Sequence, residues 1–135
     1  MRLFAYGTLM EPAVLSAVTG RPFSSQPAVL HGYARYRVRD AVYPGLVPEA
    51  EAVTVGLLYD EMDPDTLARL DAFEGALYDR LTLTVDADPT PTGPETVTAA
   101  VYVVRPAERA RLSPDRWDFA TFRRLHLATY LRQCT

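Results

Sequence analysis

Three amino acids are absent from the 135 residues of this chain: lysine, asparagine and isoleucine. All three have A/T-rich codons, so their absence indicates a GC-rich genome and not a functional choice. The 14 basic residues are therefore all arginine, and with 17 acidic residues the net charge is −3. Nucleic-acid binding usually requires a clustered basic surface, which this composition does not favour. We expect no nucleic-acid partner.

Cysteine is almost as scarce, because Cys134 is the only one. One thiol cannot form an internal disulfide or a multi-cysteine zinc site, and it suits a reducing cytosol. No apolar run approaches the roughly 18 residues that a transmembrane helix needs. The apolar stretch after Met1 is also too short for a secretory signal. We therefore expect a cytoplasmic protein that does not associate with membranes.

The familiar catalytic motifs are missing as well. The sequence has no Gly-x-Ser-x-Gly elbow, no P-loop and no dinucleotide-binding glycine pattern. His31 and His126 are isolated and have no evident metal-ligand spacing, and His126 is better explained as a packed or exposed residue of the last helix. Cys134 lies in an expected frayed tail, which argues against a nucleophilic role. We expect no metal and no cofactor.

The length suits a single domain covering residues 1–135. Helices are predicted from Glu11-Pro12 to Gly20, from Asp63-Pro64 to near Gly75, and over most of Pro114 to Leu131, because proline suits the first helical turn and glycine suits the end. Alternating or continuous apolar residues predict the strands. These strands lie at Leu3–Tyr6, Val29–Val38, Val53–Tyr59, Leu81–Val85 and Val97–Val104.

The order of these elements indicates the fold class. Tyr43-Pro44-Gly45 reads as a tight turn, and Asp86 to Glu95, with three prolines and a glycine, as a mobile loop. Strands and helices do not alternate, so a doubly wound sheet is not expected. We predict an α+β fold: a small mixed β-barrel of about five to six strands, flanked by two to three helices.

One carboxylate, Glu74, falls on the apolar side of the second predicted helix. At about 100° per residue, Leu67, Leu70 and Phe73 define one face, and Glu74 lies between Leu67 and Leu70. Burial of a carboxylate raises its pKa above about 4.3 and makes it a better general base near neutral pH. Alternatively, the helix ends at Phe73, and Glu74 turns to water or pairs with Arg80.

Two further segments are candidates for a binding site. Tyr6-Gly7-Thr8-Leu9 stands where a strand gives way to a helix, and its backbone N–H groups could hold an anion or a developing oxyanion. A plain strand-to-helix turn is the alternative. Tyr43 to Pro48 is more typical of a rigid turn than of a binding loop. Tyr78 and Arg80 either steady the Glu74 carboxylate or simply begin the next strand.

Taken in order, these motifs resemble the γ-glutamyl cyclotransferase-like superfamily. The C-terminal Trp117-Asp118-Phe119, with Phe122, His126-Leu127 and Tyr130-Leu131, is similar to its avirulence-induced-gene-like (AIG-like) branch. The resemblance spans nearly the whole chain. The motifs that carry it are Leu3-Phe4-Ala5-Tyr6-Gly7-Thr8-Leu9, Tyr43-Pro44-Gly45-Leu46-Val47-Pro48, Val55-Gly56-Leu57-Leu58-Tyr59, and Leu70-Asp71-Ala72-Phe73-Glu74-Gly75 with Tyr78 and Arg80.

The resemblance implies a small mixed barrel flanked by helices. It also implies a reaction in which a γ-glutamyl amide cyclises to 5-oxoproline and releases an amine or amino acid. Glu74 matches the family's general acid/base, and the turn at Gly7 matches the loop that holds the small-molecule γ-glutamyl substrate. The substrate's own α-amino group attacks, so the reaction needs no protein nucleophile. The expected substrate-binding residues are Tyr6, Gly7, Thr8, Leu9, Tyr43, Gly45 and Tyr78.

Two other functions stay open from the sequence. The first is a non-catalytic module that binds a small molecule in the same pocket. The second is a biosynthetic enzyme that removes a γ-glutamyl protecting group from a larger amine, which a wide pocket mouth would favour and a narrow one would not. The sequence does not indicate the leaving amine or the oligomeric state.

Overall fold

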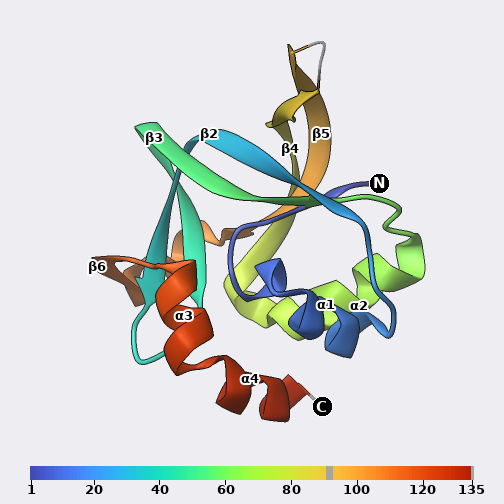
Figure 1. Cartoon of the computed structure of the whole chain (residues 1–135). Coiled ribbons are helices and arrows are strands. Elements are labelled where there is room, and N and C mark those ends of the chain that lie inside the picture. Colours follow the sequence, from blue (N-terminus) through green and yellow to red (C-terminus); the bar gives the residue numbers. More distant parts are fainter. Residues whose placement is uncertain (91–92, 135) are drawn as a thin grey trace.

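A closed barrel forms the body of the molecule in a computed structural model, which describes residues 1–90 and 93–134 (Figure 1). Its strands follow one another around the barrel as β3–β1–β5–β4–β2, and β2 pairs again with β3 to close it. β1 runs parallel to β5, and the other pairings are antiparallel. The predicted mixed barrel is thus confirmed. The strands are β1 (Leu3–Ala5), β2 (Ser25–Val38), β3 (Pro44–Tyr59), β4 (Tyr78–Thr90) and β5 (Gly93–Val104).

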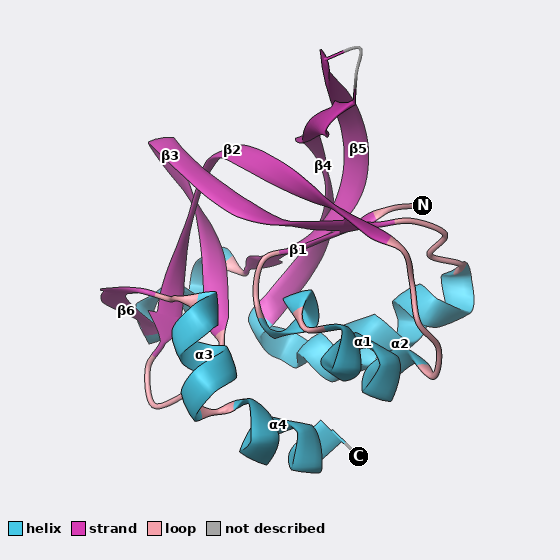
Figure 2. Ribbon diagram, in the orientation of Figure 1, coloured by secondary structure: helices cyan, strands magenta, loops and turns pink. Residues whose placement is uncertain are grey.

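Helices α1 (Pro12–Thr19) and α2 (Pro64–Glu74) lie side by side below the barrel (Figure 2). The sequence explains the start of α2, because the Asp63 side chain accepts a hydrogen bond from the Thr66 N–H at 2.7 Å and caps the helix. The helix ends at Gly75, whose φ of 75° is unfavourable for other residues. Both predicted helix boundaries are confirmed. In the described chain, no helix is long and apolar enough to cross a membrane.

The short strand β1 separates two layers of the core. Leu3 and Ala5 point outward and pack with the helices, whereas Phe4 and the adjoining Tyr6 point into the barrel. All three strand residues are buried, since both faces of β1 are covered. The segment that follows β1 is therefore held between the barrel and the helix layer.

The C-terminal quarter differs from the predicted single helix over Pro114 to Leu131. A sixth strand, β6 (Leu112–Arg116), pairs with the C-terminal end of β2. Two short helices follow, α3 (Phe119–Leu125) and α4 (Leu127–Cys134). Asp118 caps α3 by accepting a hydrogen bond from the Thr121 N–H at 2.9 Å. Proline suits a helix start as well as an edge strand, so the local sequence around Pro114 did not distinguish them.

The prediction of a mobile loop from Asp86 to Glu95 is also wrong. β4 continues to Thr90 and β5 starts at Gly93, so the two strands form one long hairpin. Residues 91–92 lie outside the described residues. The described part of the hairpin extends beyond the barrel (Figure 1), so the strands do not end at Asp86 as the composition suggested.

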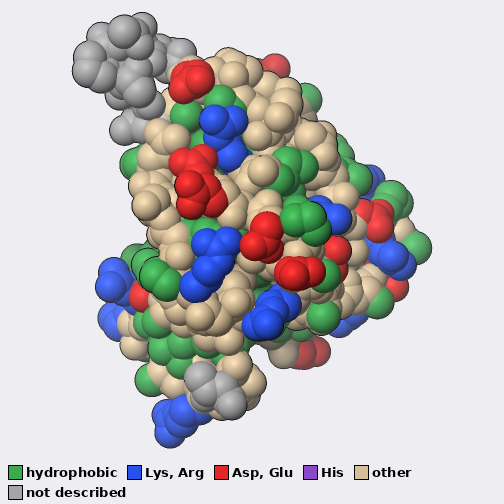
Figure 3. Space-filling view, turned by 90° about the vertical axis from the view of Figure 1, so that its right-hand side faces the viewer, with side chains coloured by type: hydrophobic (Ala, Val, Ile, Leu, Met, Phe, Trp, Pro, Cys, Tyr) green, Lys and Arg blue, Asp and Glu red, His purple; other side chains and the backbone are tan. Residues whose placement is uncertain are grey.

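Charged side chains of both signs are interspersed on the face of the molecule shown in Figure 3. Ion pairs between neighbouring elements are consistent with this mixture. Arg2 pairs with Asp60 at 3.1 Å, and Arg21 pairs with Asp63 at 3.6 Å. Such exposed pairs contribute little to stability, so the core and the hydrogen-bonded barrel carry the fold.

Gly45 lies in β3, just after its first residue, and not in the predicted tight turn. A Cβ at Gly45 would stand 2.3 Å from Val104 Cγ2 and 2.8 Å from Leu112 Cδ2. Both neighbours are packed hydrophobic side chains, so the position leaves no space for a methyl group. Close packing of β3 against β5 and β6 explains why this position holds a glycine.

We predict that Gly45→Ala lowers the free energy of unfolding by about 1–3 kcal/mol, because overpacking forces neighbouring side chains out of place. Urea denaturation would measure it. The matched control is the same substitution in a Val104→Ala background, where the nearest clashing group is gone. The two substitutions should then be coupled, and strictly additive effects would contradict the packing explanation.

Candidate functional site

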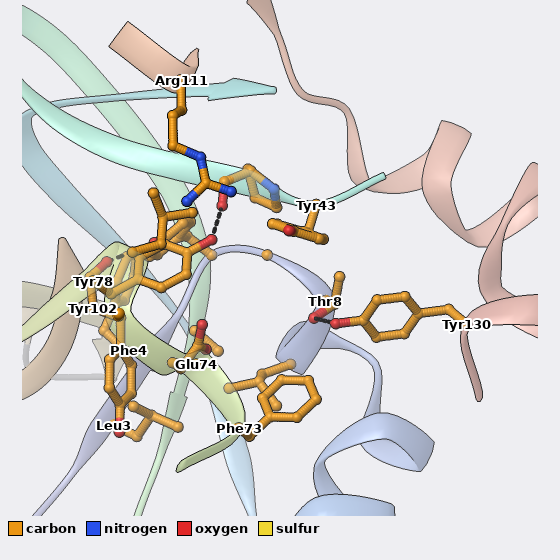
Figure 4. A pocket seen from close by; sticks show the side chains of 17 residues that line it. Leu3, Phe4, Thr8, Tyr43, Phe73, Glu74, Tyr78, Tyr102, Arg111 and Tyr130 are labelled. Carbon is orange, nitrogen blue, oxygen red and sulfur yellow. Dashed lines mark hydrogen bonds between the residues drawn. The ribbon is translucent and has the colours of Figure 1, made fainter. Parts of the chain in front are cut away.

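A cavity of about 320 Å³ lies between the barrel and the helix layer. This volume is at the small end of the range for ligand-binding pockets. All but one of the residues predicted for the site come together here, from the turn after β1, the position before β3, the end of α2 and the start of β4 (Figure 4). Seven of the eight predicted residues line the cavity: Tyr6, Gly7, Thr8, Leu9, Tyr43, Glu74 and Tyr78. Gly45 is not among the lining residues, and its binding role stays a prediction.

Glu74 is the last residue of α2, and its side chain projects into the cavity (Figure 4). The helix does not end at Phe73, and Leu70 is fully buried on the same face. Arg80 does not pair with Glu74, because its Nε lies 3.4 Å from Asp71 Oδ1. In the part of the chain that the structure describes, no hydrogen bond or ion pair engages the Glu74 carboxylate. The predicted orientation of Glu74 is confirmed.

The surroundings of Glu74 oppose its ionisation. Desolvation within the protein raises the pKa of Glu74 to about 8, and the nearby negative charge of Asp71 contributes in the same direction. The side chain is half-buried, since one side of it borders the cavity while protein covers the rest. A carboxyl group with such a pKa exchanges its proton in the neutral range. It can accept a proton and return it without a large driving force.

The turn after β1 forms the opposite wall. Gly7 lies so close to Pro44 that a Cβ would stand 2.9 Å from its Cγ. A 3₁₀ turn, Thr8–Met10, follows directly. Its first hydrogen bond is donated by the Met10 N–H to the Gly7 carbonyl, so the N–H groups of Thr8 and Leu9 have no acceptor within the turn. These N–H groups are candidate donors for a ligand.

Arg35 on β2 fixes this turn from outside the cavity. Its Nη1 donates to the Tyr6 carbonyl at 2.7 Å and to the Val55 carbonyl at 3.3 Å. The guanidinium stands 5.3 Å from the centre of the Trp117 ring. Burial lowers the pKa of Arg35, with Asp118 opposing that shift. A half-buried cation held by carbonyls leaves the turn little freedom to move.

Tyrosine hydroxyls join the walls to one another. Tyr6 donates to the Tyr102 carbonyl at 2.5 Å, and Tyr78 donates to the Pro44 carbonyl at 2.6 Å. The Thr8 hydroxyl bonds to the Tyr130 hydroxyl at 3.2 Å (Figure 4). Burial raises the pKa of Tyr6 well above its usual value, and the charge of Glu74 adds to this. The Tyr6 and Tyr78 hydroxyls stay protonated near neutral pH and act as donors, whereas the Tyr130 hydroxyl accepts from Thr8.

Several lining residues were not among the predicted site residues. Phe73, Tyr102, Arg111 and Tyr130 all border the cavity. Tyr102 points away from the barrel interior on β5 and donates to Asp71 Oδ1 at 2.7 Å. The strand alternation of β5 could have placed Tyr102 on this face. The positions of Arg111 and Tyr130 depend on β6 and the break before α4, which local sequence patterns do not indicate.

The barrel and this cavity define a protein of the γ-glutamyl cyclotransferase fold. The profile of the family described as "Gamma-glutamyl cyclotransferase, AIG2-like" matches residues 3–119, and the chain belongs to this family. The family resemblance predicted from the sequence is thereby confirmed, including its AIG-like branch.

Individual relatives agree with this assignment. Protein AIG2 C of Arabidopsis thaliana is 30% identical over 129 residues, which cover 96% of this chain and 76% of that protein. A solution structure of an Arabidopsis thaliana protein has a TM-score of 0.70 at 30% identity, covering 98% of this chain and 78% of the other. A yeast γ-glutamyl cyclotransferase specific to glutathione shares the fold, with a TM-score of 0.62 at 16% identity and coverage of 85% and 73%.

The raised pKa of Glu74 predicts a pH-dependent stability. The folded state binds the Glu74 proton up to pH of about 8, whereas the unfolded chain releases it near 4.5, so stability falls as pH rises between these values. Glu74→Gln mimics the protonated form. We expect wild type and variant to unfold alike near pH 4.5, and the variant to be more stable by roughly 2–4 kcal/mol at pH 9.

Urea denaturation across this pH range would measure the difference. Glu95→Gln makes the same substitution at an exposed site and serves as the control. A pH-independent difference for Glu74→Gln would contradict the raised pKa.

Proposed function

We propose that this protein is a γ-glutamyl cyclotransferase that converts a γ-glutamyl amide or amino-acid conjugate to 5-oxoproline, with Glu74 as general acid and base. The observation that carries the proposal is a single carboxylate with a pKa of about 8 facing the backbone of Gly7 to Leu9 across one small cavity. Membership of the γ-glutamyl cyclotransferase family supports it.

The chemistry requires little more than this arrangement. The substrate's neutral α-amine attacks its own γ-carbonyl carbon and gives a proton to the Glu74 carboxylate as the new C–N bond forms. The carbonyl oxygen becomes negatively charged, and the N–H groups of Thr8 and Leu9 stabilise it. Glu74 then returns the proton to the leaving nitrogen as the old C–N bond breaks. The products are 5-oxoproline and a free amine, so protons and bonds balance.

The walls of the cavity contribute orientation. Tyr43 and Tyr78 flank the space beside Glu74 (Figure 4). The Tyr78 hydroxyl already donates to the Pro44 carbonyl at 2.6 Å. The substrate would therefore contact the Tyr78 ring and not its hydroxyl. A cavity of about 320 Å³ suits a γ-glutamyl group with a small leaving amine better than a bulky biosynthetic amine.

Replacement of Glu74 tests the assignment directly. Glu74→Gln keeps the shape of the side chain but cannot accept the proton, so we expect the rate of 5-oxoproline formation to fall by ~10² or more. The assay is 5-oxoproline release from a panel of γ-glutamyl amides and γ-glutamyl amino acids. A variant as active as wild type would remove Glu74 from the mechanism. Binding without turnover by wild type would instead identify a small-molecule-binding module.

A second prediction concerns the neighbour that raises the pKa of Glu74. Asp71→Asn removes a negative charge but keeps an oxygen that can accept from Tyr102, so the pKa of Glu74 should fall. The acidic limb of the pH profile of kcat/KM should then move to lower pH. Asp79→Asn, an exposed residue paired with Arg105, should leave the limb in place. An unchanged limb in Asp71→Asn would exclude Asp71 as a tuning residue.

A further inference from the structure

Arg111 is the one cation among the described residues that line the cavity, and Glu74 is the one carboxylate. The two stand on opposite sides of the Tyr78 ring in the close view (Figure 4). Arg111 ends the 3₁₀ segment Pro106–Arg111, immediately before β6. The proposed mechanism gives this residue no role.

Arg111 lies at the mouth of the cavity. Its side chain is 53% exposed, whereas Glu74 is half-buried within the cavity wall. The backbone is fixed, because the Arg111 carbonyl accepts a hydrogen bond from the Arg39 N–H at 2.8 Å and the next residue, Leu112, pairs with Val38. A positioned backbone thus carries a guanidinium at the opening of the site.

The guanidinium is available to a ligand. Its ion pair is with Glu108 Oε2, three residues earlier, at 3.6 Å. An exposed pair at this distance contributes little, and a ligand carboxylate could replace it. Arginine is well suited to that exchange, because its planar fork can bind both oxygens of a carboxylate at once.

The proposed reaction decides which part of a substrate reaches Arg111. The attacking α-amine must come within hydrogen-bond distance of Glu74, and the γ-carbonyl must face the turn at Gly7. The α-carboxylate shares a carbon with that amine and stays at the inner end. Only the leaving group can extend toward the mouth.

We propose that Arg111 recognises a carboxylate on the leaving group and selects γ-glutamyl amino acids over γ-glutamyl amines that lack an acid. This inference rests on the proposed function and adds its substrate class. Arg111 is then a specificity-determining residue that acts on binding and takes no part in proton transfer.

A neighbouring hollow would favour a leaving group of the opposite charge. It shares Tyr43 and Tyr130 with the cavity and is also lined by Asp40 and His126. A leaving group that extended in this direction would meet a carboxylate, which would favour a cationic amine. Arg111 lines the cavity that holds Glu74, whereas Asp40 lines only the neighbouring hollow, so we favour the acidic leaving group.

Two substrates that differ only in the carboxylate test the proposal: γ-glutamylalanine and γ-glutamylethylamide. For wild type we expect kcat/KM to be about tenfold or more higher for γ-glutamylalanine, the usual effect of a charge-assisted hydrogen bond. Arg111→Gln should abolish this preference by raising KM for γ-glutamylalanine alone, and Arg111→Glu should reverse it. Arg109→Gln, on the same 3₁₀ segment but outside the cavity lining, should keep the wild-type ratio.

Equal losses on both substrates in Arg111→Gln would overturn the proposal, because they would indicate a structural role or contact with the α-carboxylate that both substrates share. A wild-type preference for the ethylamide would overturn it too.

If wild type released no 5-oxoproline from either compound, the proposed function would fail, and binding would decide the role of Arg111 separately. Calorimetry on Glu74→Gln should then show tighter binding of γ-glutamylalanine that Arg111→Gln removes. Equal binding of both compounds, or none, would overturn the inference.

Discussion

An ionisable carboxylate without a counter-charge is the constraint around which this molecule is arranged. Ionised Glu74 has no cationic partner in the described chain, and Arg80, the partner considered from the sequence, pairs with Asp71. Removal of a charge from water costs several kcal/mol. The fold accepts this cost next to a cavity, and the result is a proton-exchanging group with a pKa of about 8.

The rest of the site is rigid by comparison. The turn after β1 is held by a half-buried arginine, a proline and a strand that is covered on both faces. Tyrosine hydroxyls connect the walls through single hydrogen bonds to backbone carbonyls. A fixed set of N–H donors opposite one group that can change its charge suits a reaction in which the substrate supplies its own nucleophile, because the protein has only to move a proton and stabilise an oxygen.

Local signals predicted the direction of Glu74 better than they predicted the edges of the fold. The cap at Asp63, the proline after it and the apolar spacing of Leu70 together fixed the rotation of α2, and hence the direction of Glu74. The predictions of a helix over β6 and of a loop in the β4–β5 hairpin were wrong. Proline occurs in loops, in edge strands and at helix starts, so its presence alone does not distinguish these structures. Arg111 and Tyr130 could not be found, since only long-range strand pairing and helix docking bring them to the cavity.

The hydrogen bond between Thr8 and Tyr130 joins residues 122 positions apart. Tyr130 lies beyond the 3–119 segment that matches the family, yet it borders the same cavity as the turn at Gly7. Closing a contact of such sequence separation costs more chain entropy than closing a local one, so the ordered barrel between the two residues supports it. The pocket therefore joins two segments that lie far apart in the sequence, and ligand binding would report that α4 has docked on the barrel.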